Sequence, residues 1–180
     1  LVLSHAHDYT RADSLFQEQT KTDAEIIALL TNDDAEVYMR GRTITGDILL
    51  SGNNVKLAGL GQTGTATGST AASTLAHTVT VNGRILVSGT NVVIDGIHFK
   101  FACEWTDDAD EFPMISFLGG TNTKLTIKNC TFENTGSHAD GRFLCGENSG
   151  GGTQTIENCE IKNFTSWMLL DATTGSATAT

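Results

Sequence analysis

The sequence predicts an all-β fold, in which one chain winds into a single-stranded, right-handed parallel β-helix of about five coils. Three observations indicate this fold: an internal repeat, apolar and polar residues that alternate within each copy, and an amphipathic helix ahead of the first copy. Residues 43–60 and 80–97 align without a gap, and nine of the 18 positions are identical. Repetition at a period of about 37 residues is typical of stacked structural units, each of which needs its neighbours to bury its apolar face.

Two shorter copies of the repeat follow at residues 125–132 and 154–161. The alignment predicts two columns of inward-facing side chains, one of isoleucines and one that begins with an isoleucine and continues with cysteines. These columns are Ile94, Ile127 and Ile156, and Ile97, Cys130 and Cys159. We interpret the cysteines as small apolar core residues, because their spacing matches neither a zinc site nor a disulfide framework.

Alternation within a copy predicts short strands with one buried face. Ile127, Cys130 and Phe132 are expected to face inward and Thr131 outward. Asn129 is expected at a corner between two strands, because Asn tolerates the left-handed backbone conformation that such a bend needs. A third short strand is predicted upstream of each corner, which gives three strands per coil and excludes the four antiparallel strands of a propeller blade.

The segment before the first coil carries signals for a helix. Thr22 and Glu25 form a capping-box pattern, and the apolar residues at 26, 27, 29 and 30 follow at helical spacing. We predict an N-terminal extension at 1–21, a capping helix at 22–34 and the β-helix at 35–180. No comparable plug is evident at the other end, so either more chain or a partner subunit is expected to cover it.

Charge and hydropathy exclude two classes of partner. The 180-residue chain has a formal net charge of −10 and no run of Lys and Arg, so it would repel nucleic acid. Its apolar runs are far shorter than the roughly 20 residues that span a bilayer.

The uncharged segment 61–76, rich in Gly, Thr, Ser and Ala, is expected to be a flexible lateral loop or a strip ordered by a neighbouring subunit.

Two stretches, residues 35–50 (AEVYMRGRTITGDILL) and 54–61 (NVKLAGLG), resemble the first coils of pectate-lyase-like β-helix proteins. The resemblance covers roughly residues 22–170. This superfamily includes polysaccharide lyases, glycoside hydrolases, epimerases, and the tailspikes, appendages and decoration proteins of bacteriophages. The resemblance therefore implies the scaffold far more than the activity.

An acidic segment at 104–111 interrupts the repeat and holds five carboxylates. Its aspartates, Asp107, Asp108 and Asp110, are candidate ligands of Ca²⁺, a cation that prefers several oxygen ligands. The segment lacks the glycine and spacing of an EF-hand loop, so a solvated acidic loop is the preferred interpretation. We predict no cofactor and keep Ca²⁺ as the alternative.

The same aspartates, together with Asp95, are candidates for a pair of catalytic carboxylates, which a glycosidase holds about 5–10 Å apart. A lyase also needs a base, for which His98 and Lys100 are the nearest candidates. His5 and His7 are candidate metal ligands on one side of an extended chain, although an ordinary N-terminal tail is the preferred interpretation.

Among the tryptophans, Trp105 in the acidic segment is a candidate contact for a glycan or a protein, because exposed aromatic rings stack on sugars. Trp167 is expected in a core strand.

We favour a non-enzymatic bacteriophage structural protein, a capsid decoration or cement protein or a tail appendage, at the virion surface or otherwise extracellular. It would act by protein–protein assembly on a capsid or tail protein, and the resemblance to phage proteins of this superfamily implies a homo-oligomer, with a trimer favoured. The small domain, its Thr/Ser/Gly/Asn-rich composition and its single evident plug support this choice. The first alternative is a β-helix that binds or degrades polysaccharide, as a lyase or glycosidase such as a tailspike domain, and contacts a surface glycan. The second alternative is a bacterial cell-surface module.

Overall fold

The computed structural model describes residues 20–66, 73–103, 113–117, 124–136, 142–146, 153–164, 166–170 and 176–179. For 117, 142–146, 166–170 and 176–179 it describes the course of the backbone only. Within this part of the chain, β-strands dominate and every pair of named strands is parallel. The prediction of an all-β fold is confirmed.

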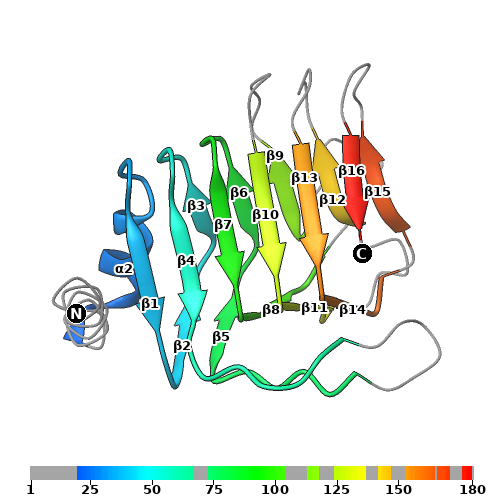
Figure 1. Cartoon of the computed structure of the whole chain (residues 1–180), viewed down its shortest axis with the longest axis horizontal. Helices are drawn as coiled ribbons and strands as arrows, with labels where there is room; N and C mark the ends of the chain where they lie inside the picture. Colours follow the sequence, from blue (N-terminus) through cyan, green and yellow to red (C-terminus); the bar gives the residue numbers. More distant parts are fainter. Residues whose placement is uncertain are drawn as a thin grey trace, which may run out of the picture.

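The strands form three parallel sheets, which we name A, B and C. In spatial order, sheet A contains β1 (Glu36–Met39), β4 (Lys56–Gly59), β7 (Val92–Asp95), β10 (Lys124–Lys128), β13 (Thr153–Glu157) and β16 (Ser176–Ala179). Sheet B contains β2 (Arg42–Thr45), β5 (Val79–Asn82), β8 (His98–Phe101), β11 (Thr131–Asn134) and β14 (Glu160–Lys162). Sheet C contains β3 (Ile48–Leu50), β6 (Ile85–Val87), β9 (Ile115–Phe117), β12 (Arg142–Gly146) and β15 (Ser166–Leu170). Each strand pairs with the strands three places before and after it, so one passage through A, B and C makes a coil (Figure 1).

The register of the sheets follows the sequence repeat. Ile127 pairs with Ile94 on one side and with Ile156 on the other, as the first predicted column requires. The alignment of the two longer copies is equally visible in the pairing of Ile48 with Ile85. A single inward isoleucine per coil thus keeps three strands of sheet A in register, because a slip by one residue would turn each of these side chains to the outside.

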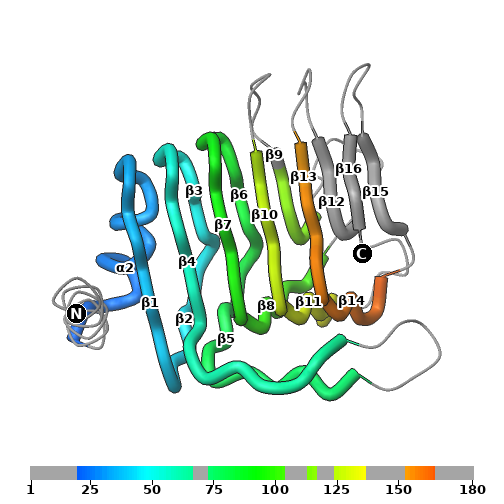
Figure 2. Tube along the Cα trace, in the orientation of Figure 1, coloured from blue at the N-terminus to red at the C-terminus, as the bar shows by residue number. Residues whose placement is uncertain are grey.

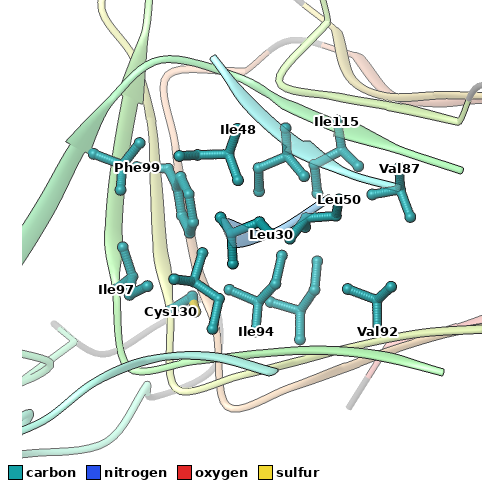
Figure 3. Packing of buried hydrophobic residues seen from close by; sticks show 14 of the residues in the cluster. Leu30, Ile48, Leu50, Val87, Val92, Ile94, Ile97, Phe99, Ile115 and Cys130 are labelled. Atoms are coloured by element: carbon teal, nitrogen blue, oxygen red, sulfur yellow. The ribbon is translucent and has the colours of Figure 1, made fainter. Parts of the chain in front are cut away.

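Side chains from all three sheets converge on one core (Figure 3). Phe99 of β8 and Phe132 of β11 stack with their ring centroids 5.3 Å apart, and both are fully buried. In the predicted cysteine column, Cys130 is fully buried, and Cys159 is half-buried against the core. The core interpretation therefore holds for these two cysteines and for buried Cys103, whereas the side chain of Cys145 lies outside the described part.

The helix α2 (Asp23–Leu29) lies at the N-terminal end of the stack, where it contacts β3 (Figure 2). Its capping box is formed, because the Thr22 hydroxyl accepts from the Glu25 amide and the Glu25 carboxylate accepts from the Thr22 amide. Ile26 and Leu30 are fully buried in the core. The predicted helix and its apolar contact with the stack are confirmed, while the boundaries at residues 21 and 34 stay predictions. None of the described helices is long and apolar enough to cross a membrane.

Left-handed residues form the corners of the coils. Between sheets C and A these are Asn54 and Asn91, with φ of 58° and 55°. At the corner between sheets A and B the left-handed residues are Gly96, Asn129 and Asn158, with φ of 75°, 52° and 50°. The predicted corner at Asn129 is confirmed. The corner between sheets C and A, formed by Asn54 and Asn91, was not predicted, although these two asparagines are identical positions of the sequence repeat.

These corner asparagines form ladders of side-chain hydrogen bonds. Asn54 Nδ2 donates to Asp34 Oδ1 at 2.9 Å, and Asn91 Nδ2 donates to Asn54 Oδ1 at 3.0 Å. In the other corner, Asn158 donates to Asn129 at 2.7 Å and Asn129 donates to Asp95 at 2.8 Å. Each amide therefore ties its coil to the previous one.

Asn54 provides a test of the ladder. Asn54→Ala removes a donor and an acceptor and places Ala in a left-handed conformation, so we expect a loss of about 3 kcal/mol of unfolding free energy. Asn54→Gly removes the same hydrogen bonds without the conformational strain, so a loss of about 1 kcal/mol is expected. Urea denaturation measures both, and Thr45→Ala on the exposed face of β2 serves as control. Equal losses for Ala and Gly would show that the backbone conformation contributes nothing.

Residues 61–66 and 73–78, which we name the arm, belong to the connection between β4 and β5 and run along the outside of sheet B (Figure 1). The two limbs of the arm pair through an antiparallel bridge between Thr63 and Ala76. The first limb is held by the amide of Ala66, which donates to Asn158 Oδ1 at 2.7 Å. The prediction of a flexible loop is therefore wrong for residues 61–66 and 73–76, which pair with each other and dock on the chain's own stack.

The arm also corrects the expectation for Thr131. This residue lies on the outer face of sheet B, as the alternation predicts, yet its exposed fraction is only 2%. His77 of the arm covers it, with His77 Nε2 2.9 Å from the Thr131 hydroxyl. The two-residue period gives the direction of a side chain, whereas its exposure depends on what the rest of the chain places above it.

Candidate functional site

Most of the site residues predicted from the sequence lie outside the described part of the chain. These are His5, His7, Trp105, Asp107, Asp108 and Asp110, and their predicted roles in metal, glycan or substrate binding stay predictions. Asp95, His98 and Lys100 are described. Within the described ranges, no group of three or more His, Cys, Asp or Glu side chains has the geometry of a metal site.

Asp95 ends β7 at the corner between sheets A and B. Its Oδ1 atom accepts the hydrogen bond from Asn129 Nδ2, so the carboxylate takes part in the asparagine ladder. His98 begins β8 beyond the same corner, and its partner is Glu133 rather than Asp95. The structure therefore separates the two predicted candidates into different contacts.

His98, Lys100 and Glu133 come together on the outer face of sheet B. The strands β8 and β11 are in register, with Thr131 opposite His98 and Glu133 opposite Lys100. The Glu133 carboxylate can therefore reach both neighbours, and its Oε2 atom lies 2.9 Å from His98 Nε2 and 3.8 Å from Lys100 Nζ. All three side chains are partly shielded from solvent.

The arm supplies a second imidazole to this cluster. The ring of His77 lies 5.9 Å from that of His98, measured between centroids, while its Nε2 atom contacts Thr131. We name the group of His77, His98, Lys100, Thr131 and Glu133 the histidine cluster. It joins residues of β8, β11 and the arm that are distant in the sequence.

Burial determines the charge of both imidazoles. It is the largest cause that lowers the pKa of His77, against the opposing effects of the Gly96 backbone and Glu160. It also lowers the pKa of His98, an effect that the nearby Lys100 ammonium increases and the Glu133 carboxylate opposes. Both rings are therefore neutral at pH 7, and His98 Nε2 carries the proton that it donates to Glu133.

The cluster has the elements of acid–base chemistry. A neutral imidazole in contact with a carboxylate is the arrangement by which enzymes orient a general base. A second carboxylate, Glu160, lies on β14 opposite Thr131, and is thus a diagonal neighbour of Glu133. Glycosidases use two carboxylates, so Glu133 and Glu160 are the pair of this cluster that such chemistry would need.

Glu133, Glu160 and His77 were not among the candidates predicted from the sequence. The alternation contained the signal for Glu133, since the residue after inward-facing Phe132 must face outward on β11, the strand of sheet B next to β8. His77 had no such signal, because it lies in the insertion that forms the arm and not in a repeat.

Stability is expected to fall as the pH drops below about 6.5, since His77 and His98 are neutral in the folded chain. In the unfolded chain both rings titrate at their ordinary pKa near 6.5, whereas in the fold they titrate lower. Below pH 6.5 the unfolded state therefore binds more protons, and the stability that is fully present above this pH is lost. The charges that face the rings are those of Lys100, Glu133 and Glu160 in addition to Lys162.

Thermal unfolding from pH 7.5 to 5.5 measures this dependence in a range where ordinary carboxyl groups do not titrate. The double variant His77→Gln/His98→Gln should lose most of the slope, while His7→Gln in the predicted N-terminal extension should keep it. An unchanged slope in the double variant would contradict the assignment to these two rings.

Comparison with family models, curated proteins and solved structures finds no match to this chain.

Proposed function

We propose that the three parallel sheets form a right-handed parallel β-helix, of the kind that the pectate-lyase-like resemblance implies. Two observations support this proposal. Every described strand pairs with the strands three places away, which is the pattern of a coil with three strands. Connections between parallel strands of one sheet are right-handed in about 98% of cases, because only that hand lets a twisted strand return onto its sheet.

We further propose that the chain is a non-enzymatic structural protein of a bacteriophage-type particle, a decoration or appendage domain that acts by assembly. The observation that carries this proposal is that outward polar side chains bind the neighbouring coil. Arg84 lies 3.3 Å from Asp47 of the previous coil, and Lys128 lies 3.9 Å from Glu157 of the next. Together with the asparagine ladders, these contacts stiffen the stack along its length, which suits a rigid component of a particle.

A face for self-association is available on sheet A. Val93, Thr126 and Thr155 lie in one outward row and present short, uncharged side chains. Beside it runs the outward row of Asp95, Lys128 and Glu157, whose charges alternate in sign. A second and a third copy of this chain can approach such a face closely and pair its charges with their own, so we propose a homotrimer that packs through this strip.

Light scattering after size-exclusion chromatography tests the assembly. A trimer at micromolar concentration is expected, and Thr126→Arg should convert it to monomer because a long charged side chain would project from the strip. Thr45→Arg is the matched control, since Thr45 is exposed on the outer face of sheet B, and should leave the trimer intact. A monomeric wild-type chain would overturn the proposed trimer.

Location on a particle needs its own test. Immunogold labelling of particles purified from the source, with an antibody against the chain, is expected to decorate the capsid or tail surface. Particles that lack the chain by both labelling and mass spectrometry would contradict a place in the virion.

A polysaccharide-degrading function is the second candidate, and it is favoured by the Glu133 carboxylate beside His98 and by Glu160, whose charge acts on His77. Assays of reducing ends and of unsaturated uronates over a panel of polysaccharides test it directly. Turnover that Glu133→Gln abolishes and Glu36→Gln retains would replace the structural proposal with this one. No turnover, together with a trimer, would support assembly.

A further inference from the structure

Two cysteines hold equivalent positions in successive coils. Cys130 follows the corner residue Asn129, and Cys159 follows the equivalent corner residue Asn158. The strands on both sides are in register, β10 with β13 and β11 with β14, so the two cysteines between them are neighbours. Adjacent strands are about 4.8 Å apart, which lies within the Cα separations of about 4.4–6.8 Å that disulfides bridge.

The two thiols have equivalent orientations. Cys130 Sγ donates to the carbonyl of Lys128 at 3.1 Å, and Cys159 Sγ donates to that of Glu157 at 3.2 Å. Cys159 Sγ also lies 3.9 Å from the carbonyl oxygen of Ile127, which belongs to the coil of Cys130. Both are free thiols in this structure, and each influences the pKa of the other.

The surroundings make the two thiols unequal. The hydrogen bond with Cys130 lowers the pKa of Cys159, which is half-buried, whereas burial raises the pKa of the fully enclosed Cys130. Burial also raises the pKa of Cys103 to about 12, so that thiol is a poor nucleophile. Cys159 is therefore the most reactive of these three thiols, because the thiolate is the attacking species and a lower pKa gives a larger fraction of thiolate.

We propose that Cys130 and Cys159 are a redox modification site, which low-molecular-weight disulfides such as oxidised glutathione convert to a disulfide between successive coils. The Cys159 thiolate attacks one sulfur of the oxidant, whose S–S bond breaks and releases one glutathione thiolate. Cys130 then loses its proton and attacks Cys159 Sγ, which releases the second glutathione. Two protein thiols are oxidised by two electrons, one disulfide of the oxidant is reduced, and the two protons end on the two glutathione molecules.

The disulfide would fasten β13 and β14 to the coil that precedes them. It would close the loop between Cys130 and Cys159, and the loss of freedom in the unfolded chain stabilises the fold. For a chain of this length, the gain corresponds to a rise in midpoint temperature on the order of 10 °C. By linkage, the folded chain forms the bond more readily than the unfolded chain.

The experiment incubates the full chain with defined ratios of reduced and oxidised glutathione, folded in buffer and unfolded in urea. Digestion with trypsin and a glutamate-specific protease separates Cys159 from Cys145, because Arg142, Glu147 and Glu157 lie around them. Mass spectrometry should find the fragments 129–133 and 158–160 linked, with at least tenfold more linkage in the folded chain at the same ratio. A glutathione adduct without an internal link, a link to another cysteine, or equal linkage in urea would overturn the proposal.

Matched variants test whether the disulfide between Cys130 and Cys159 raises the stability of the fold. The oxidant should raise the midpoint temperature of the wild type and of Cys103→Ser, but not that of Cys159→Ser. The linkage measured in the wild type decides the proposal even where a serine variant fails to fold. A rise that persists in folded Cys159→Ser would show that another modification is responsible.

Discussion

Replacing Phe99 by alanine should lower the free energy of unfolding by about 4 kcal/mol. The ring is fully buried between the sheets and stacks on Phe132 of the next coil, with an angle of 10° between the ring planes. Truncation removes a large apolar surface, leaves a cavity that close-packed neighbours cannot fill, and deprives Phe132 of its stacking partner. Because a coil is stable only on its neighbours, the loss should extend beyond β8.

Urea denaturation followed by circular dichroism measures this effect. Phe99→Leu is the matched control, because it retains most of the apolar volume, and a loss of less than about 1.5 kcal/mol is expected for it. A double-mutant cycle with Phe132→Ala should give a coupling of about 1 kcal/mol between the two rings. If Phe99→Ala cost no more than Phe99→Leu, the two coils could not be packed as described.

The repeat made much of the register predictable. Ile94, Ile127 and Ile156 share a column because coils of similar length stack in register, and the alternation of apolar residues determines which face they occupy. The helix α2 was equally predictable, since Thr22 and Glu25 form a local signal that needs no tertiary information. Both predictions depend on periodicity or on neighbours in the sequence.

The contents of the candidate site were less predictable. Glu133 contacts His98 because β8 and β11, which belong to successive coils, lie in register, and an alignment of strands can suggest such a contact. His77 reaches Thr131 only through the course of the arm, and the arm has no counterpart in the other described coils. Its low-complexity sequence resembles that of a flexible loop, and what orders the described limbs is their pairing with each other and with Asn158.

The asparagine corners lie between these extremes. The identity of Asn54 and Asn91 in the alignment marked a common requirement, but the alignment could not distinguish a backbone requirement from a side-chain one. The structure shows both, a left-handed conformation and a ladder of amides. Glycine satisfies only the first requirement, which is why Gly96 can occupy the other corner while the neighbouring Asp95 carboxylate receives the hydrogen bond from Asn129.

Gly89→Ala should destabilise the fold by about 3 kcal/mol, although it adds a single methyl group. Gly89 and Gly52 hold the same position in successive coils, and the Gly89 amide donates to the Leu50 carbonyl at 3.0 Å. A Cβ atom on Gly89 would overlap the carbonyl oxygen of Gly52, which belongs to the backbone and cannot rotate away. The stack must separate at this corner, which lengthens the hydrogen bonds of the strands on both sides.

The conformation of Gly89 makes this test specific. Its φ lies outside the left-handed region, so alanine can adopt the same backbone, and steric overlap with the preceding coil is what remains to destabilise the chain. Gly41 is the opposite case, since its φ is +62° and a Cβ there would meet nothing within 4 Å. Gly41→Asn should therefore cost less than about 1 kcal/mol, because Asn tolerates that conformation. If chemical denaturation instead gave Gly89→Ala the smaller loss, the close approach of coils at this corner would be refuted.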